Sequence, residues 1–390
     1  MTTSRTALNG LTWNHPRGYV VLDALAAEDG PGGTAVRWDR QPLEGFESTP
    51  LRTLADRYDL LVIDHPGLGE AVGDRALRPL GTLLPEEELA GWAAVSAGRS
   101  FASYRLAGQQ WALPLDAAAQ VSVGRPGRLD ERPSTWDEAV CAAGRYPSVV
   151  CLGGPHALLM FCSICVALGA PPAADPGTAA AGRDGGFADR QAGREALAVM
   201  ARLFGHGRPF YSEKANPIAV LNSMAAGDGS GPVYCPLVYG YISYQGRLAA
   251  FDAPAGPAGI GSVLGGTGIA VTRSCARLDE AAALIRLLLS PGVQIGRYAE
   301  LGGQSADRRA WRDPAADRRA GGFYSATGRT IEAAWVRPRY AGYIPFQSAA
   351  SAVLREGLER DDDHDDLLDR VDKLFAGTAS PAEATTRRSG

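Results

Sequence analysis

The sequence predicts an α/β protein with two lobes, and two observations favour that fold class. The chain has 390 residues, of which 45% are hydrophobic and 21% are charged, enough to give each of two lobes its own core. Short apolar runs that stop at turn residues alternate with segments of helical periodicity along most of the chain, as in α/β proteins. We therefore expect a soluble protein in which strands and helices alternate.

The strands are predicted from short apolar runs. The run that ends at Asp64 stops before a Pro-Gly turn, and a later run stops at Gly153 and Gly154. Runs of this length predict buried strands. The four predicted strands cover residues 59–64, 148–152, 233–238 and 268–272.

The helices are predicted from caps and from apolar residues at helical spacing. Thr135 and Glu138 form a capping-box pattern that predicts a helix through Cys141, and Asp279 can cap another. The apolar stretch 157–170 is too short for the roughly 20 residues that span a membrane, so it predicts a buried helix. Two helical faces are expected to turn inward: Leu197, Met200, Leu203 and Phe204, and Leu284, Ile285, Leu287 and Leu288.

Charge and cysteine usage narrow the classes of function. A net charge of -4 supplies no positive excess for nucleic-acid phosphates, so no nucleic-acid partner is expected. Residues 1–9 show no apolar signal region and no lipid-anchoring Cys, which predicts a cytoplasmic protein without membrane insertion. Cys162 and Cys165 have CxxC spacing but no second pair and no nearby His. They are expected to be reduced core cysteines.

Cofactor and metal motifs are absent from the sequence. Residues 265–268 lack the GxGxxG spacing, and neither a GxxxxGK[ST] loop nor a GxSxG elbow occurs. The acidic run at residues 361–366 begins like a calcium loop but has Asp366 where the loop needs Gly. We expect no metal and no cofactor.

Three segments are candidates for a composite site. The first, residues 11–19, is dense in aromatic and ionisable groups, and the second, residues 64–67, follows a predicted strand at the end where α/β sheets bind ligands. The third, residues 334–347, holds two arginines beside aromatic residues that could clamp an anion and stack on a flat face. The candidates in these segments are Trp13, His15, Arg17, Asp64, His65, Trp335, Arg337, Arg339 and Tyr343.

Each segment also has a structural interpretation. Trp13 and Trp335 could be core residues. Asp64 and His65 could cap the turn that follows them, and the two arginines of the third segment could be surface or salt-bridged residues.

Several motifs together resemble a known family. Trp13-Asn-His-Pro-Arg17-Gly18, the strand that ends at Asp64, and Pro133-Ser-Thr-Trp136-Asp-Glu138 are similar to bacterial extracellular solute-binding proteins of the carbohydrate ABC-transporter type. Three further motifs occur in the order that the family shows, at residues 104–116, 236–241 and 265–271. The resemblance extends from about residue 8 to residue 375.

The resemblance implies a periplasmic-binding-protein-like fold with two lobes, a multi-crossing hinge and a ligand cleft between the lobes. The chain would cross near residues 114–120, near residues 239–244 and after about Gly303. The expected division is 1–115 and 241–303 for lobe 1, 116–240 and 304–378 for lobe 2, and a disordered tail at 379–390. The cleft would add Tyr104, Asp116 and Tyr239 to the candidates above.

Two functions remain open at the level of sequence. The first is a cytoplasmic acid–base enzyme (lyase, isomerase, cyclase or hydrolase type) for a polar or anionic substrate, in which His15 or His65 transfers a proton and Asp64 orients its partner. The missing export signal and the titratable groups expected in the cleft favour it. The alternative is a non-catalytic binding protein, either the substrate-binding component of a carbohydrate-type ABC transporter, with a permease as its partner, or a cytoplasmic ligand sensor.

Overall fold

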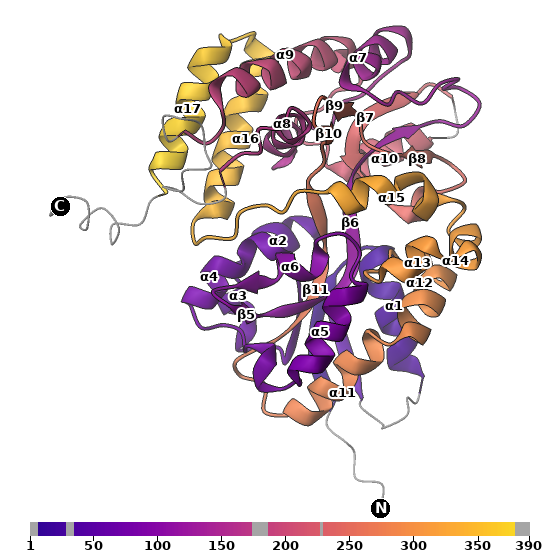
Figure 1. Ribbon diagram of the computed structural model, residues 1–390, viewed down its shortest axis with the longest axis vertical. Coiled ribbons are helices and arrows are strands. Elements are labelled where there is room, and N and C mark those ends of the chain that lie inside the picture. The colour runs from indigo at the N-terminus through magenta and orange to yellow at the C-terminus, as the bar shows by residue number, and fades with distance from the viewer. Residues whose placement is uncertain (1–6, 29–34, 174–185, 227–228, 379–390) are drawn as a thin grey trace, which may run out of the picture.

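The computed structural model describes residues 7–28, 35–173, 186–226 and 229–378. It contains two α/β lobes, one above the other in Figure 1, connected by long strands that run through both. We call the lobe that holds the N-terminal strands the first lobe and the other the second lobe. The predicted tail at 379–390 and most of the predicted loop at 171–186 lie outside the described residues.

The first lobe is built on a sheet that begins with three parallel strands. β1 (Leu8–Trp13) lies between β2 (Val36–Gln41) and β3 (Leu60–Ile63), and β11 (Leu264–Val271) adds to β3 in the antiparallel direction. The predicted strands at 59–64 and 268–272 are thus confirmed. The helices of this lobe are α1 (Pro16–Ala27), α2 (Leu43–Ser48), α3 (Leu51–Ala55), α4 (Leu68–Gly73), α5 (Glu86–Val95), α6 (Ser100–Ser103), α11 (Leu278–Leu288), α12 (Tyr298–Glu300), α13 (Arg308–Arg312) and α14 (Pro314–Arg319).

One strand belongs to both lobes. All of β6 (Ala112–Gly124) is buried, and its first part, as far as Ala119, pairs with β11. From Gln120 onward it pairs with β7 (Tyr234–Tyr239) and β8 (Ala249–Phe251) of the second lobe. The sheet order is therefore β2-β1-β3-β11-β6-β7, with β8 also on β6. A shared strand of this kind makes the connection between the lobes continuous.

The expected division of the chain differs from the structure in two segments. One is the start of 304–378, which was assigned to the second lobe but contains α13 and α14 of the first lobe. Residues 241–303 were assigned to the first lobe, yet β8 pairs with the part of β6 that lies in the second lobe. Tyr241, at the start of the segment, packs against Trp13 and His15 of the first lobe, and β11 enters that lobe by pairing with β3. The last crossing follows α15 (Phe323–Ala333), where Trp335 exchanges backbone hydrogen bonds of 2.8 Å with Ser262 and Leu264.

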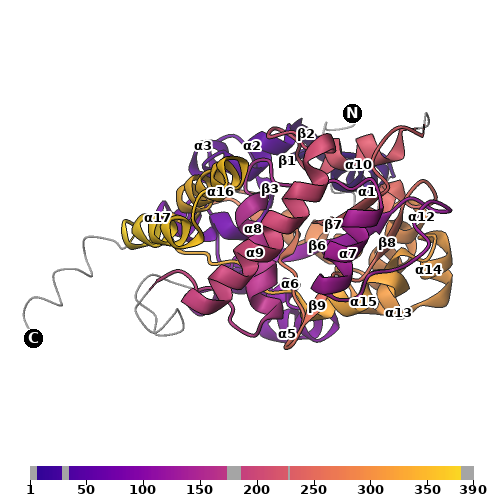
Figure 2. The same cartoon turned by 90° about the horizontal axis from the view of Figure 1, so that it is seen from above.

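The second lobe buries its apolar side chains among five helices. These are α7 (Trp136–Arg145), α8 (His156–Ala167), α9 (Arg190–Gly207), α16 (Tyr343–Arg360) and α17 (His364–Ala376). α16 and α17 lie side by side in both views (Figures 1 and 2). The predicted capping box at Thr135 is present, and the predicted inward face of α9 is buried.

Two sequence expectations need correction. Residues 148–152 were predicted to be a strand but form none; they are buried and make a single β-bridge, from Ser148 to Tyr234. The apolar run reflects burial, and burial does not require that a neighbouring strand pair along its length. In α11 the N-cap is Arg277 rather than Asp279, and Leu287 is only half-buried.

Five cysteines are buried, whereas Cys141 is exposed on α7. Burial raises the pKa of the Cys162 thiol well above its ordinary value, which leaves it unreactive. Among the described residues, no helix is long and apolar enough to cross a membrane, and no cluster of His, Cys, Asp and Glu is suited to hold a metal ion.

The remaining elements of the second lobe are α10 (Pro217–Ala225), β9 (Ala255–Gly256) and β10 (Gly259–Ile260), and the hairpin β4 (Arg105–Leu106) and β5 (Gln109–Gln110) lies in the first lobe.

Candidate ligand-binding cleft

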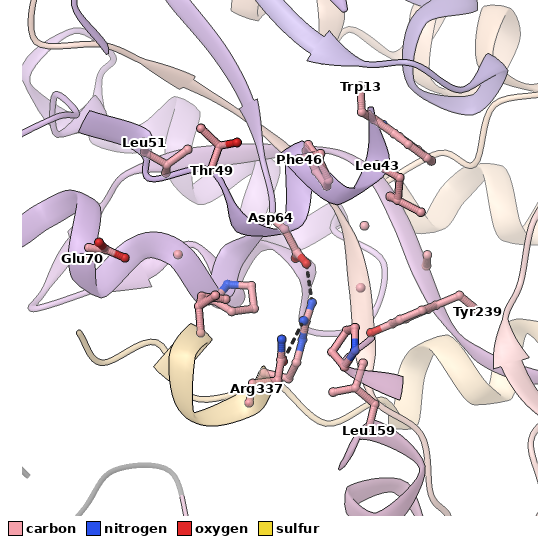
Figure 3. Close-up of a pocket in the computed structure, with 18 of the residues that line it drawn as sticks. Trp13, Leu43, Phe46, Thr49, Leu51, Asp64, Glu70, Leu159, Tyr239 and Arg337 are labelled. Atoms are coloured by element: carbon pink, nitrogen blue, oxygen red, sulfur yellow. Dashed lines mark hydrogen bonds and ion pairs between the residues drawn. The ribbon is translucent and has the colours of Figure 1, made fainter. Parts of the chain in front are cut away.

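A cleft that is open to solvent lies between the lobes (Figure 3). The ends of β1 and β3 and the helices α2 and α3 line it from the first lobe, and the start of α8 and of α16 line it from the second. Its polar and aromatic lining residues are Trp13, Arg17, Phe46, Thr49, Asp64, Glu70, Tyr239, Tyr241, Arg337 and Gln347.

The segment after β1 packs its aromatic and basic side chains on one another. The Trp13 ring is 1% exposed and stacks on His15, with 4.9 Å between the ring centres. His15 is the N-cap of α1, and its Nδ1 accepts a hydrogen bond of 3.1 Å from the backbone N–H of Arg17. Burial, followed by the nearby Arg17 charge, lowers the pKa of His15 to about 3. The imidazole is therefore neutral at pH 7 and its Nδ1 is engaged in the cap.

Arg17 forms a buried ion pair with Asp116 of β6. Its Nε lies 2.8 Å from Oδ2 of Asp116, and its guanidinium carbon lies 4.6 Å from the centre of the Tyr241 ring. Asp116 also accepts hydrogen bonds from the backbone N–H and the hydroxyl of Thr267, at 2.6 and 3.0 Å. Burial raises the pKa of Asp116, although Arg17 and Thr267 act in the opposite direction. Arg17 lines the cleft, whereas Asp116 lies behind it.

A second arginine–carboxylate pair lies at the end of β3. Oδ2 of Asp64 accepts a hydrogen bond of 2.5 Å from Arg337, and Oδ1 accepts one of 2.8 Å from the backbone N–H of His65 (Figure 3 shows Asp64 and Arg337). Burial acts to raise the pKa of Asp64, but the Arg337 charge and the His65 contacts outweigh it and hold that pKa well below its usual range. Asp64 is thus an ionised cap of the turn His65–Gly67.

His65 lies behind Asp64, not in the cleft. Its side chain is fully buried, with Nδ1 3.2 Å from Oδ1 of Asp64 and its ring at 90° to that of Tyr104. Burial lowers the pKa of His65 to about 4, although Asp64 opposes the shift. Tyr104 is also buried behind the strand ends, where its hydroxyl donates to the carbonyl of Ile63 at 3.1 Å.

The segment that precedes α16 holds Arg337 in place. Arg339 donates hydrogen bonds from Nη1 to three carbonyls of the first lobe, those of Ala102, Ser103 and Arg105, at 2.8 to 3.1 Å. Arg339 itself does not line the cleft, so it is not placed to clamp an anion there. Trp335 is half-buried and packs on the core of the second lobe.

Two of the predicted tyrosines differ in where they lie. Tyr239 lines the cleft, and its hydroxyl donates to the carbonyl of Leu264 at 3.3 Å. Tyr343 is fully buried at the start of α16 against Tyr340, and burial raises the pKa of its hydroxyl well above the ordinary value.

The structure therefore brings together part of the predicted set. Trp13, Arg17, Asp64, Tyr239 and Arg337 line the cleft. The other candidates lie in or behind its walls: His15, His65, Tyr104, Asp116, Trp335, Arg339 and Tyr343.

Sequence reasoning missed much of the lining. Leu43, Phe46 and Leu51 come from α2 and α3 and carry no chemical signature. Tyr241 and Gln347 lie in the motifs 236–241 and 334–347, close in sequence to the candidates Tyr239 and Arg337. That closeness could have indicated that they line the cleft too. His156 was also missed; it is 1% exposed at the start of α8, and its ring lies 5.8 Å from that of Tyr239.

Comparison with known proteins rests on structure. No family model matches the chain, and no curated protein matches its sequence. Solved structures match over almost the whole length: maltose-bound MalE3 of T. maritima has 18% identity and a TM-score of 0.75, and covers 95% of this chain and 98% of its own. The chain has the fold of the carbohydrate ABC-transporter solute-binding proteins.

Two more structures of this solute-binding fold are equally similar. An ABC-transporter solute-binding protein from Agrobacterium radiobacter in complex with ribitol has 18% identity and a TM-score of 0.77, covering 96% of this chain and 98% of its own. The maltotriose-binding protein of Thermus thermophilus, bound with maltotriose, has 15% identity and a TM-score of 0.75, covering 96% and 100%. The predicted resemblance and the two-lobe fold are confirmed.

Proposed function

We propose that this chain is a non-catalytic binding protein that closes its two lobes on a small organic molecule. It would serve as the substrate-binding component of an ABC transporter, with a permease as its partner, or as a ligand sensor. The fold supports this proposal, since the similar structures are solute-binding proteins with maltose, ribitol or maltotriose bound. Hinge closure around a ligand is the characteristic motion of such folds.

The observation that carries the proposal is that the predicted acid–base groups are engaged or buried. His15 caps a helix and His65 is fully buried, and neither lines the cleft. A general base works best with a pKa near the operating pH, whereas these imidazoles have pKa values of about 3 and about 4. Asp64 is held ionised by Arg337, so it is a poor proton donor. Binding is therefore better supported than catalysis.

The charges in the cleft also favour a ligand without net charge. Arg17 is paired with Asp116, Arg337 is paired with Asp64, and Arg339 is bonded to backbone carbonyls. The anion clamp expected from these arginines would need at least one of them unpaired. The choice between transporter and sensor depends on the compartment, for which a cytoplasmic location stays a prediction.

The proposal is tested by ligand screening and scattering on the full chain. A panel of small organic molecules is screened by thermal shift, and each stabilising compound is then incubated with the protein and recovered. We expect the recovered compound to be chemically unchanged and the radius of gyration from small-angle X-ray scattering to decrease on binding. Chemical conversion of a bound compound would establish an enzyme instead, if the His65→Gln variant loses that conversion. The control His206→Gln, at an exposed position, should retain it.

A further inference from the structure

Both lobes contribute apolar side chains to the walls of the cleft. Leu43, Phe46 and Leu51 of the first lobe are only half-buried and lie across the open space from Leu159 of the second (Figure 3). The half-buried Ile344 of the second lobe also lines the cleft. An apolar side chain left partly exposed in a cleft gains about 25 cal/mol for each Å² that a ligand removes from water. These walls would bind an apolar surface better than a row of hydroxyl groups.

The two arginines of the cleft have few hydrogen-bonding positions left. Arg17 is occupied by Asp116, and Arg337 by Asp64 and by Oε1 of Gln347, at 3.3 Å. A sugar carries hydroxyl groups on most of its carbons, and each one buried without a partner weakens binding. The arginines would supply few partners for them, so these hydroxyl groups would depend on side chains such as Thr49 and Glu70.

The largest aromatic residue is not an open platform. Trp13 is 1% exposed, its ring stacks on His15 and Phe46, and its Nε1 is buried near Gly18. The aromatic surface that remains for a ligand is that of Phe46 and Tyr239, both half-buried. These two rings continue the apolar walls.

One polar position in the cleft combines an acceptor with a donor. The Asp64 carboxylate keeps 19% of its side chain exposed, so it can accept from a ligand N–H. Because Oε1 of Gln347 accepts from Arg337, its NH₂ end is the part left to donate to a ligand carbonyl. The charges of Asp64 and Arg337 cancel, and Glu70 adds a negative charge nearby, which disfavours an anionic head group.

We propose that the ligand of this cleft is an uncharged amphipathic molecule, with an apolar body of ring size and one head group that carries a donor beside an acceptor, as a carboxamide does. The body would lie between Leu43 and Leu51 of the first lobe and Ile344 of the second, and the head would meet Asp64 and Gln347. This inference rests on the proposed binding function and specifies its ligand class.

The test uses three probes on the full chain: 2-naphthamide, its anionic counterpart 2-naphthoate, and maltose. Titration calorimetry is expected to give 2-naphthamide a Kd of about 1 mM or tighter, as for a ligand of its size. We expect 2-naphthoate to bind about tenfold more weakly because of Asp64 and Glu70, and maltose more weakly than either. Maltose bound as tightly as the amide, naphthoate bound equally well, or no binding of the amide would each overturn the inference.

A substitution in the wall locates the binding. Leu51→Asn places a polar group in the apolar wall, and it should weaken 2-naphthamide about tenfold. The matched control Leu287→Asn alters a half-buried leucine of α11 outside the cleft and should leave the affinity unchanged. Equal effects of the two substitutions would place the amide elsewhere and overturn the inference, provided circular dichroism shows both variants folded.

The outcomes separate the two proposals. Maltose that binds, closes the lobes and is recovered unchanged would retain the binding function and overturn only the amphipathic ligand class. Conversion of 2-naphthamide to naphthoate, seen by chromatography, would instead overturn the non-catalytic function while the ligand class survived.

Discussion

The cleft is bordered by two groups of the same three residue types in different arrangements. In one, His15 lies beside Arg17, which pairs with Asp116; in the other, His65 lies beside Asp64, which pairs with Arg337. Burial prevails at Asp116, whose pKa is raised, whereas the partners prevail at Asp64, whose pKa is lowered.

The difference follows from exposure and from the position of the histidine. Asp116 is 2% exposed and the neighbouring imidazole caps a helix, so this group ties β1, α1 and β6 together. Asp64 keeps 19% exposure and turns its carboxylate towards the cleft. The first group stabilises the structure near the hinge, and the second offers a ligand an acceptor.

The largest expected effect comes from breaking the deeper pair. Asp116→Ala leaves the Arg17 charge buried without its partner, and it should lower the free energy of unfolding by about 3–5 kcal/mol. Urea titration followed by tryptophan fluorescence measures the loss. The control Asp365→Ala breaks the exposed pairs with Arg190 and Arg194 and should cost less than about 1 kcal/mol. Similar losses for both variants would show that burial of the ion pair does not determine the cost of breaking it.

Breaking the cleft-facing pair should cost less stability. Asp64→Ala removes the partner of Arg337, whose side chain is itself buried. Because the deleted carboxylate faces the cleft, solvent can take its place beside the guanidinium and Gln347 stays in contact, so we expect a loss of about 1–3 kcal/mol. The same urea titration measures it. A loss as large as that of Asp116→Ala would remove the distinction between the two groups.

His15, the histidine of the first group, should make the stability of the fold depend on pH. With a folded pKa of about 3 and an unfolded pKa of about 6.5, the unfolded chain binds the extra proton, so stability falls as the pH falls below about 6.5. His15→Asn keeps a capping acceptor and removes this titration, so its stability should fall by about 1–2 kcal/mol less than that of the parent between pH 7 and pH 5. Urea titrations at both pH values measure this, with exposed His206→Asn as control. Identical slopes for parent and His15→Asn would show that His15 does not titrate abnormally.

The smallest expected effect concerns the support of Arg337. Arg339→Lys keeps the charge, but the lysine side chain ends about one bond short of Nη1, so it reaches the three carbonyls less well and we expect a loss of about 1 kcal/mol or less. The urea midpoint measures stability and calorimetry measures 2-naphthamide affinity. A lower stability with unchanged affinity would show that Arg337 is positioned without Arg339.

The fold was predictable because its signals are local. The capping box at Thr135 and the apolar run at β3 each specify an element on their own. The run at residues 148–152 misled, because apolar side chains are buried in irregular segments as well as in strands. The crossing of β6 between the lobes followed from the resemblance rather than from any single residue.

The site was predictable only where a strand end fixed it. Asp64 follows β3 and Trp13 ends β1, and both line the cleft. Sequence could not show that the imidazoles of His15 and His65 would be engaged or buried, since that depends on three-dimensional packing. Nor could the sequence identify Leu51 as a cleft residue, because an apolar residue in a binding wall has the same pattern as one in the core.

The exposed thiol of α7 has a practical consequence. Because Cys141 is the exposed cysteine of the chain and the other five are buried, a maleimide dye should attach to the unaltered protein at one position of the second lobe. Adding one cysteine to an exposed site of the first lobe would then create a donor–acceptor pair. Energy transfer between the two dyes could follow the opening and closing of single molecules without any replacement of native cysteines.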